Sequence, residues 1–193
     1  MKLGQKTQVR SPAGAANASG AAPPATPSAL FAVFDRPLAN AWSDGPVSGD
    51  EICPGLTIYH DAGDSLFYWR QRDLNLEMTV YQFQGTYLSL AAGMPAAMIS
   101  MLGPGRGVSA TIDATASRPV TVFFRLNLDL PDGRETLHET FVLHRGERQA
   151  TFDLDGVTGR LDAARDAWLD LILADPAMTE LTIHNLDVDV FDV

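Results

Sequence analysis

The chain has 193 residues, of which 46% are hydrophobic, and a formal net charge of −10. This length and composition suit one domain with a buried core. The negative charge disfavours nonspecific binding to nucleic acid, because like charges repel over about 8 Å in physiological salt. No segment approaches the ~18 apolar residues of a membrane span, and no apolar stretch of a secretory signal follows the N-terminal lysines. We therefore expect a cytoplasmic protein with no nucleic-acid partner and no membrane span.

Residues 1–29 differ in composition from the rest of the chain. They are rich in Ala, Pro, Gly and Ser, and their only charged side chains are Lys2, Lys6 and Arg10. The remainder carries 11 arginines and 24 acidic residues, a net charge of −13. A stretch with so few bulky side chains cannot bury enough surface to offset the entropy lost on ordering. We predict a flexible, disordered tail over 1–29 and one β domain over 30–193, with its core beginning near residue 48.

Short alternating segments separated by turns occupy the chain from residue 56 onward. The clearest signal is segment 119–130, where apolar side chains occur at every second position from Val120 to Leu130. Half-buried β-strands show this period of two. The same alternation, or a short apolar run, predicts the other strands: 56–60, 65–72, 74–83, 86–91, 108–113, 135–144, 148–155, 168–173 and 180–191.

Turn residues and phase changes divide these strands. The sequence Pro131-Asp132-Gly133 predicts one hairpin turn, and Arg145-Gly146-Glu147 predicts another. The apolar side chains change phase at His184-Asn185, which predicts a β-bulge.

One segment has the spacing of a helix instead. Leu161, Ala164 and Trp168 recur at helical intervals, so we predict a short helix near 159–166. Segment 94–102 fits either a helix or a strand. Many short strands with turns at this spacing indicate an all-β fold, and we predict an antiparallel, jelly-roll-like β-sandwich.

Several short motifs in this order resemble an uncharacterised alphaproteobacterial domain family of unknown function. The likeness covers about residues 48–190 and leaves out the tail. It implies a bacterial source and a single β domain, and it implies no catalytic residue. The motifs that carry it are Gly49–Glu51, Leu56–Asp61, Val80–Phe83, Gly85–Leu90, Phe124–Asn127, Trp168–Ile172, Met178 and Leu181–Asp187.

Two predicted strands combine aromatic and polar side chains on one face. Glu77 and Tyr81 share a face of segment 74–83, whereas Phe123, Arg125 and Asn127 share a face of segment 119–130. If both strands lie in one sheet, aromatic rings stand among planar hydrogen-bonding groups, a setting in which proteins bind sugars. These five residues are our candidate ligand-binding residues. Alternatively, another element or subunit covers the rings, and their role is packing.

The first hypothesis is therefore a non-catalytic binding module for a glycan or polysaccharide. One alternative is a structural or assembly protein of a bacterial or virus-like complex, whose exposed face contacts another protein. The other alternative is a carbohydrate-active enzyme. Such an enzyme needs two carboxylates about 5–9.5 Å apart, and Glu77 with Asp129 or Asp73 is the best pairing that the sequence offers.

A calcium site near the C-terminus is a weaker hypothesis. Asp187, Asp189 and Asp192 alternate at the end of the last strand. Calcium prefers six to eight oxygen ligands, and Asp50 and Glu51 would add to them if the first strand lies alongside. A charged edge strand that opposes aggregation explains the same pattern and is the preferred interpretation. We therefore expect no cofactor, with Asp187 and Asp189 as the calcium candidates.

Overall fold

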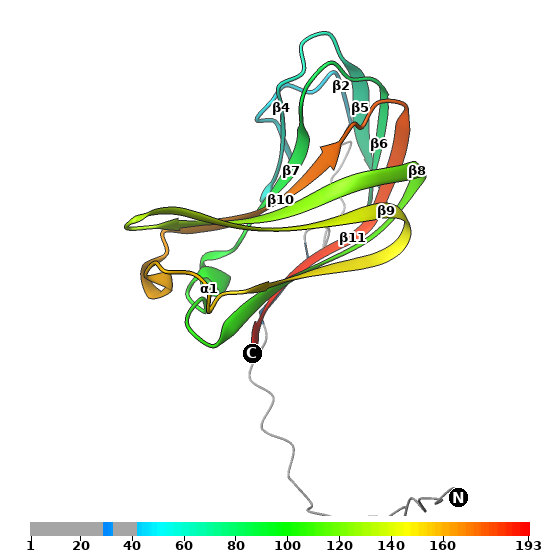
Figure 1. The fold of residues 1–193 in the computed structure, drawn as a ribbon. Helices are drawn as coiled ribbons and strands as arrows, with labels where there is room; N and C mark the ends of the chain where they lie inside the picture. Colours follow the sequence, from blue (N-terminus) through cyan, green and yellow to red (C-terminus); the bar gives the residue numbers. More distant parts are fainter. Residues whose placement is uncertain (1–28, 33–41) are drawn as a thin grey trace, which may run out of the picture.

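A computed structural model describes residues 29–32 and 42–193, with side chains from residue 45 onward. The tail predicted over 1–29 lies outside the described residues, apart from Ala29. The described strands pair antiparallel throughout and curl into two layers that pack face to face (Figure 1). The elements in chain order are β1 (Ala29–Ala32), β2 (Trp42–Asp44), β3 (Glu51–Cys53), β4 (Leu56–His60), β5 (Leu66–Arg72), β6 (Asn75–Gln82), β7 (Leu88–Gly93), α1 (Ala96–Ile99), β8 (Arg106–Leu130), β9 (Gly133–Asp153), the 3-10 turn η1 (Leu161–Ala163), β10 (Asp166–Ala174) and β11 (Thr179–Asp192).

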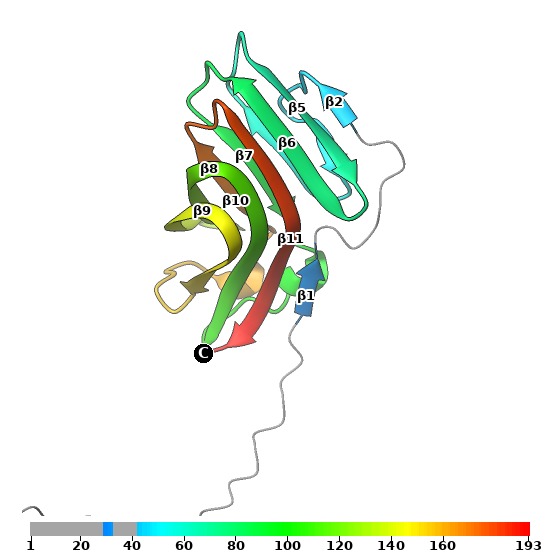
Figure 2. The same ribbon diagram turned by 90° about the vertical axis from the view of Figure 1, so that its right-hand side faces the viewer.

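Each layer is named here after its central strand. The β10 layer has the order β3-β4-β7-β10-β8-β9 and uses residues 120–130 of β8 and 133–143 of β9. The β11 layer has the order β2-β5-β6-β11-β8-β9 and uses residues 106–116 of β8 and 145–153 of β9. Strand β1 pairs with β11 beside this second layer (Figure 2). This arrangement confirms the predicted all-β, jelly-roll-like sandwich.

The long strands β8 and β9 belong to both layers. Strand β8 pairs with β11 up to Ala116 and with β10 from Thr121 onward. Between these halves, the register with β9 shifts, so that four β8 residues stand opposite one β9 residue. The side chain of Arg118 fixes this bend by donating hydrogen bonds to the backbone carbonyls of Asp175 and Ala177. One continuous hairpin therefore links the two layers.

The structure confirms two of the predicted turn features and corrects a third. A turn at Pro131 and Asp132 joins β8 to β9, and the register of β11 shifts between Ile183 and Asn185, as expected. The hairpin turn predicted at 145–147 is wrong, because β9 continues through it. Gly146 has a φ of 85°, which a glycine adopts without strain, so the strand bends there where a turn was expected.

The predicted helix near 159–166 is present only as the single turn η1. Leu161 is its buried residue, and β10 begins at Asp166. Trp168, which completed the helical spacing, therefore lies in a strand. Segment 94–102, for which the sequence fitted either a helix or a strand, contains the short helix α1. No helix of the described residues is long and apolar enough to cross a membrane.

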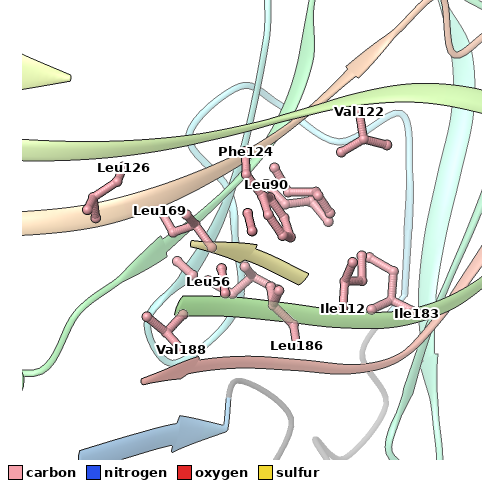
Figure 3. Packing of buried hydrophobic residues seen from close by; sticks show 14 of the residues in the cluster. Leu56, Leu90, Ile112, Val122, Phe124, Leu126, Leu169, Ile183, Leu186 and Val188 are labelled. Atoms are coloured by element: carbon pink, nitrogen blue, oxygen red, sulfur yellow. The ribbon is translucent and has the colours of Figure 1, made fainter. Parts of the chain in front are cut away.

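The hydrophobic core lies between the two layers (Figure 3). In most strands with described side chains, the core residues occupy alternate positions, as the period of two predicted. Burying each large aliphatic or aromatic side chain contributes roughly 1.5–3 kcal/mol, so this core supplies the main force that holds the layers together. From the β10 layer it includes Leu56, Leu90, Phe124, Leu126 and Leu169, and from the β11 layer Ile112, Ile183, Leu186 and Val188.

Candidate functional site

The outer face of the β10 layer holds a groove of about 510 Å³. Strands β4, β7, β10 and β8 contribute to it, together with residues next to β4 and β7. Its walls combine aromatic, charged and hydroxyl side chains over a floor of small residues. The lining residues are Gly55, Thr57, Tyr59, Tyr87, Ser89, Ala91, Gly93, Arg125, Asp166, Trp168 and Asp170.

The hollow follows from the small side chains of β7. Leu88, Leu90 and Ala92 point into the core, so Ser89, Ala91 and Gly93 point outward. Strand β7 lies between β4 and β10 in the sheet. Since neighbouring strands are about 4.8 Å apart, the two flanking strands stand roughly 10 Å from each other with only small side chains between them.

Three aromatic side chains line this groove. Tyr59 projects from β4 opposite Ser89, and Tyr87 precedes β7. Both rings are partly exposed, Tyr59 by 43% and Tyr87 by 38%. Trp168 lies on β10 opposite Gly93, and the guanidinium of Arg134 stacks 4.7 Å from its ring centroid. This cation–π contact holds the indole in place at the groove.

A charged cluster lies between the aromatic residues. The Asp170 carboxylate is 5% exposed and accepts hydrogen bonds at Oδ2 from Arg125 Nε (2.9 Å) and Nη2 (2.7 Å). Asn127 Nδ2 donates to the same oxygen at 2.8 Å. A buried carboxylate needs such partners, because desolvation of an unpaired charge costs several kcal/mol. Arg125 remains 47% exposed, so its guanidinium faces both Asp170 and solvent.

The position of Tyr87 depends on a carboxylate from another loop. Asp61 Oδ1 accepts hydrogen bonds from the backbone N–H groups of Thr86 (2.7 Å) and Tyr87 (3.1 Å), and Oδ2 accepts one from the Thr86 hydroxyl. The hydrogen bond from Thr86 is the main reason that the pKa of Asp61 lies below its ordinary value of 3.8. A Cβ at Gly85 would lie 2.5 Å from Asp61 Oδ1, so a larger residue at this position would displace the carboxylate.

The hydroxyl of Ser89 lies at the floor of the groove. Ser89 is only 4% exposed, and its Oγ has no hydrogen-bond partner within the described part of the chain. Buried hydroxyls are normally paired, since an unsatisfied one costs about 1–3 kcal/mol. Among the described residues, the Ser89 hydroxyl is therefore an unsatisfied polar group that lies covered beneath the groove floor.

The sequence matches DUF6478, described as a family of unknown function, over residues 25–190. The chain belongs to this family. The match confirms the resemblance to an uncharacterised family that the order of the motifs indicated. No curated protein matches the chain.

Similar solved structures include two carbohydrate-binding modules and a phage protein. The family 11 module of a cellulosomal cellulase of Clostridium thermocellum is 11% identical, with a TM-score of 0.44 over 88% of this chain and 96% of that chain. A xylan-binding domain of Paenibacillus barcinonensis is 8% identical, with a TM-score of 0.45 over 86% and 94%. The enzymatically active domain of a bacteriophage CBA120 tailspike is 13% identical, with a TM-score of 0.47 over 72% of this chain and 19% of that chain.

The structure separates the five candidate residues of this DUF6478 member into two groups. Arg125 lines the groove, and Asn127 lies buried beneath it against Asp170. Phe123 is half-buried on the same strand face, where it pairs with Ile172. Glu77 and Tyr81 lie on β6 in the β11 layer, so they do not share a surface with the other three.

The second group has partners of its own. Glu77 forms an ion pair with Arg70, whose side chain is 53% exposed. The ring of Tyr81 lies 6.1 Å from that of Tyr68, and a hydrogen bond between the two side chains raises the pKa of Tyr81. These contacts join neighbouring strands β5 and β6 across their outer face.

The sequence patterns did not identify the aromatic residues of the groove or its buried carboxylate: Tyr59, Tyr87, Trp168 and Asp170. For Trp168 and Asp170 a signal was present, because 166–173 alternates outward polar or aromatic residues with Ala167, Leu169 and Leu171. The segment was interpreted as an apolar strand that follows a helix, which hid this alternation. The position of Tyr87 had no such signal, since Asp61 determines it.

The structure tests one of the two carboxylate pairings that the enzyme hypothesis offered. Glu77 and Asp129 lie in different layers, so this pairing is wrong. The other candidate, Asp73, lies in the turn between β5 and β6, in the same layer as Glu77. In the groove, Asp166 and Asp170 are four residues apart on one strand, which places their Cα atoms about 13 Å from each other. Asp170 is also engaged by Arg125 and Asn127.

The calcium candidates lie on β11. Asp187 accepts a hydrogen bond from the side-chain amide of Asn185. Burial raises the pKa of Asp189 above its ordinary value. Among residues 29–32 and 42–193, no group of three or more His, Cys, Asp or Glu side chains is placed to hold a metal ion.

Proposed function

We propose that this protein is a non-catalytic binding module whose groove on the β10 layer holds a glycan chain. One observation carries the proposal: Tyr59, Tyr87 and Trp168 surround a trough whose floor and walls also present Ser89 and Arg125. Few ligands combine apolar faces with many hydroxyl groups as sugars do.

The two kinds of side chain would contact different parts of a sugar. The C–H faces of a pyranose ring stack on aromatic rings, whereas its hydroxyls exchange hydrogen bonds with polar side chains at the edges. Arg125 directs two of its five N–H groups to Asp170, which leaves three for a ligand as far as the described residues show. The Asp166 carboxylate supplies a further polar contact along the trough.

The same residues favour binding over catalysis. A glycosidase uses two carboxylates on either side of the scissile bond, at most about 9.5 Å apart. Asp170 instead positions Arg125, and Asp166 lies a further four residues along the strand. The groove therefore offers recognition without a matched acid and base.

A calorimetric screen of polysaccharides tests the proposal. We expect at least one polysaccharide to bind, and Trp168→Ala to weaken its binding by about thirty-fold, because buried aromatic anchors contribute about 2 kcal/mol or more. Tyr81→Ala, which removes an aromatic ring from the other layer, serves as the matched control. Absence of binding across the screen, or equal effects of the two variants, would contradict the proposal.

Assembly with another protein is a second candidate function, and it has its own observation. Tyr81 is 48% exposed and Met178 is 72% exposed, and Met178 precedes the residue that pairs with Val80 beside Tyr81. Adjacent exposed apolar side chains mark surfaces for protein contact. Light scattering of wild type and of a Tyr81→Ser, Met178→Ser double variant tests this, and a monomeric wild type at high concentration would remove self-assembly.

A further inference from the structure

We infer that the groove selects an uncharged glycan and discriminates against both anionic and cationic chains. This inference rests on the proposed glycan-binding function and adds the chemical class of the ligand. It rests on the hydrogen bonds and the ion pair that the charged and polar groups of the groove already form with one another.

The middle of the groove is electrically balanced, so it offers an anion no net positive charge. Among the described residues, Arg125 is the positive group in the lining, and the two hydrogen bonds that it donates there both go to Asp170. A carboxylate or sulfate that drew Arg125 away would leave the buried Asp170 charge with Asn127 as its remaining partner. Because an unpaired buried charge is strongly unfavourable, the new contact with the anion would not compensate for the lost ion pair.

Negative charge at both ends strengthens this exclusion. Asp166 lines the groove beside Trp168 and stands directly opposite Asp129, with Arg134 next in register. At the other end, Asp61 lies behind the backbone of Tyr87. An anionic chain that spans the three aromatic rings would therefore bring like charges together at each end.

A cationic chain would be attracted by Asp166 at one end of the groove, but its donor groups do not match the centre. The exposed N–H groups of Arg125 are donors only, and ammonium groups are also donors only. A chain of amino sugars would thus place donors and positive charge against the centre of the groove. Sugar hydroxyls avoid this, because each can accept a hydrogen bond from Arg125 or donate one to Asp166.

The experiment compares polymers with the same backbone and different charge. Wild-type protein is titrated with dextran, dextran sulfate and diethylaminoethyl-dextran, with hydroxyethyl, carboxymethyl and quaternised cellulose, and with charged derivatives of any other neutral polysaccharide that binds. We expect the uncharged member of a series to bind about ten-fold or more tightly than either derivative. Its affinity should change by less than about two-fold between roughly 50 and 500 mM NaCl, because no net charge is neutralised.

Two variants connect the selection to the groove. Asp166→Asn should narrow the ratio between uncharged and anionic affinities, because it removes a repelling charge. Glu77→Gln, which removes one negative charge from the β11 layer, should leave that ratio unchanged. Equal effects of the two variants would show that overall charge, and not the groove, determines selection.

The possible failures are distinguishable. If a charged derivative binds as tightly as its parent or more tightly, and Trp168→Ala abolishes that binding, the glycan-binding function stands and the inference about charge is overturned. If no polymer of any class binds, the proposed function fails and the inference falls with it.

Discussion

The outer faces of the two layers carry similar residue types, but the face of the β10 layer is recessed at its centre. Both have tyrosines, and both have one arginine paired with one acidic residue. On the β10 layer, the small side chains of β7 recess the centre of the face, and Asp170 is 5% exposed beneath Arg125. On the β11 layer, Arg70 and Glu77 are 53% and 24% exposed. A binding surface is thus distinguished by depth and desolvation, and residue type alone does not identify it.

Filling the trough should have the largest effect on binding. Ala91 lies on the groove floor between Thr57 and Asp170. A benzyl group at this position would occupy the space of a sugar, so Ala91→Phe should reduce glycan affinity by about a hundred-fold or more. Thr79→Phe on the outer face of β6 is the control and should have no effect on affinity. Calorimetric titration of both variants, after circular dichroism shows that they are folded, measures the contrast.

The two arginines should differ strongly in their contribution to stability. Arg125→Ala leaves the Asp170 carboxylate buried with one amide donor, which should lower the free energy of unfolding by about 3 kcal/mol. Arg70→Ala breaks a more exposed pair and should cost less than about 1 kcal/mol. Urea denaturation of each variant provides the comparison. Similar losses for both would mean that Asp170 is better solvated than its 5% exposure implies.

Loss of the Asp61 contacts should have a smaller effect on binding. Asp61→Asn retains the acceptor for the backbone N–H groups but loses one for the Thr86 hydroxyl, so Tyr87 is held less firmly. Each hydrogen bond contributes roughly 0.5–1.5 kcal/mol, so we expect glycan affinity to fall about three-fold. Asp64→Asn in the same loop is the control and should leave affinity unchanged.

The Asp61 carboxylate also makes the stability of the protein depend on pH, and the direction of its pKa shift gives the sign of this dependence. The pKa of Asp61 is lower in the folded chain than its ordinary value of 3.8. The stability that it contributes is therefore fully present above that value and is lost as the pH falls through the folded pKa. The melting temperatures of wild type and Asp61→Asn are measured between neutral and acidic pH. The difference between them should shrink as the pH falls below 3.8. A difference in melting temperature that does not shrink as the pH falls below 3.8 would contradict the assignment.

Removing the Ser89 hydroxyl should produce the smallest change. Ser89→Ala deletes a polar atom that has no hydrogen-bond partner among the described residues, so stability should stay the same or rise slightly. Glycan affinity should fall by about two- to five-fold if the hydroxyl contacts the ligand. Paired measurements of melting temperature and affinity separate the two roles, and unchanged affinity would exclude Ser89 from the ligand contacts.

The sequence was sufficient to predict the strands from residue 56 onward, because most of them bury one face. Val120 to Leu130 alternate, and burial of the even-numbered positions follows directly. The bend that merges 108–113 with 119–130 into one strand was not predictable in this way, because it depends on Arg118 reaching carbonyls more than fifty residues away. Local patterns contain no information about such contacts.

The site was only partly predictable for the same reason. Arg125 and Asn127 were identified because they occupy outward positions on a strongly alternating strand. Tyr59 and Trp168 are over a hundred residues apart, and they line one groove because β7 pairs with both β4 and β10. Alternation fixes the face on which a side chain lies, whereas the order of strands decides which faces become neighbours.

The β8–β9 hairpin has a further consequence for how the protein folds. Since each layer contains half of this hairpin, neither layer is complete until the other has started to form. Strand pairs that join distant parts of the chain, such as β6 with β11, lose much loop entropy before they gain contacts, so folding should be slow. We expect the amide hydrogens of both halves of β8 to exchange with solvent only through global opening, as one cooperative unit.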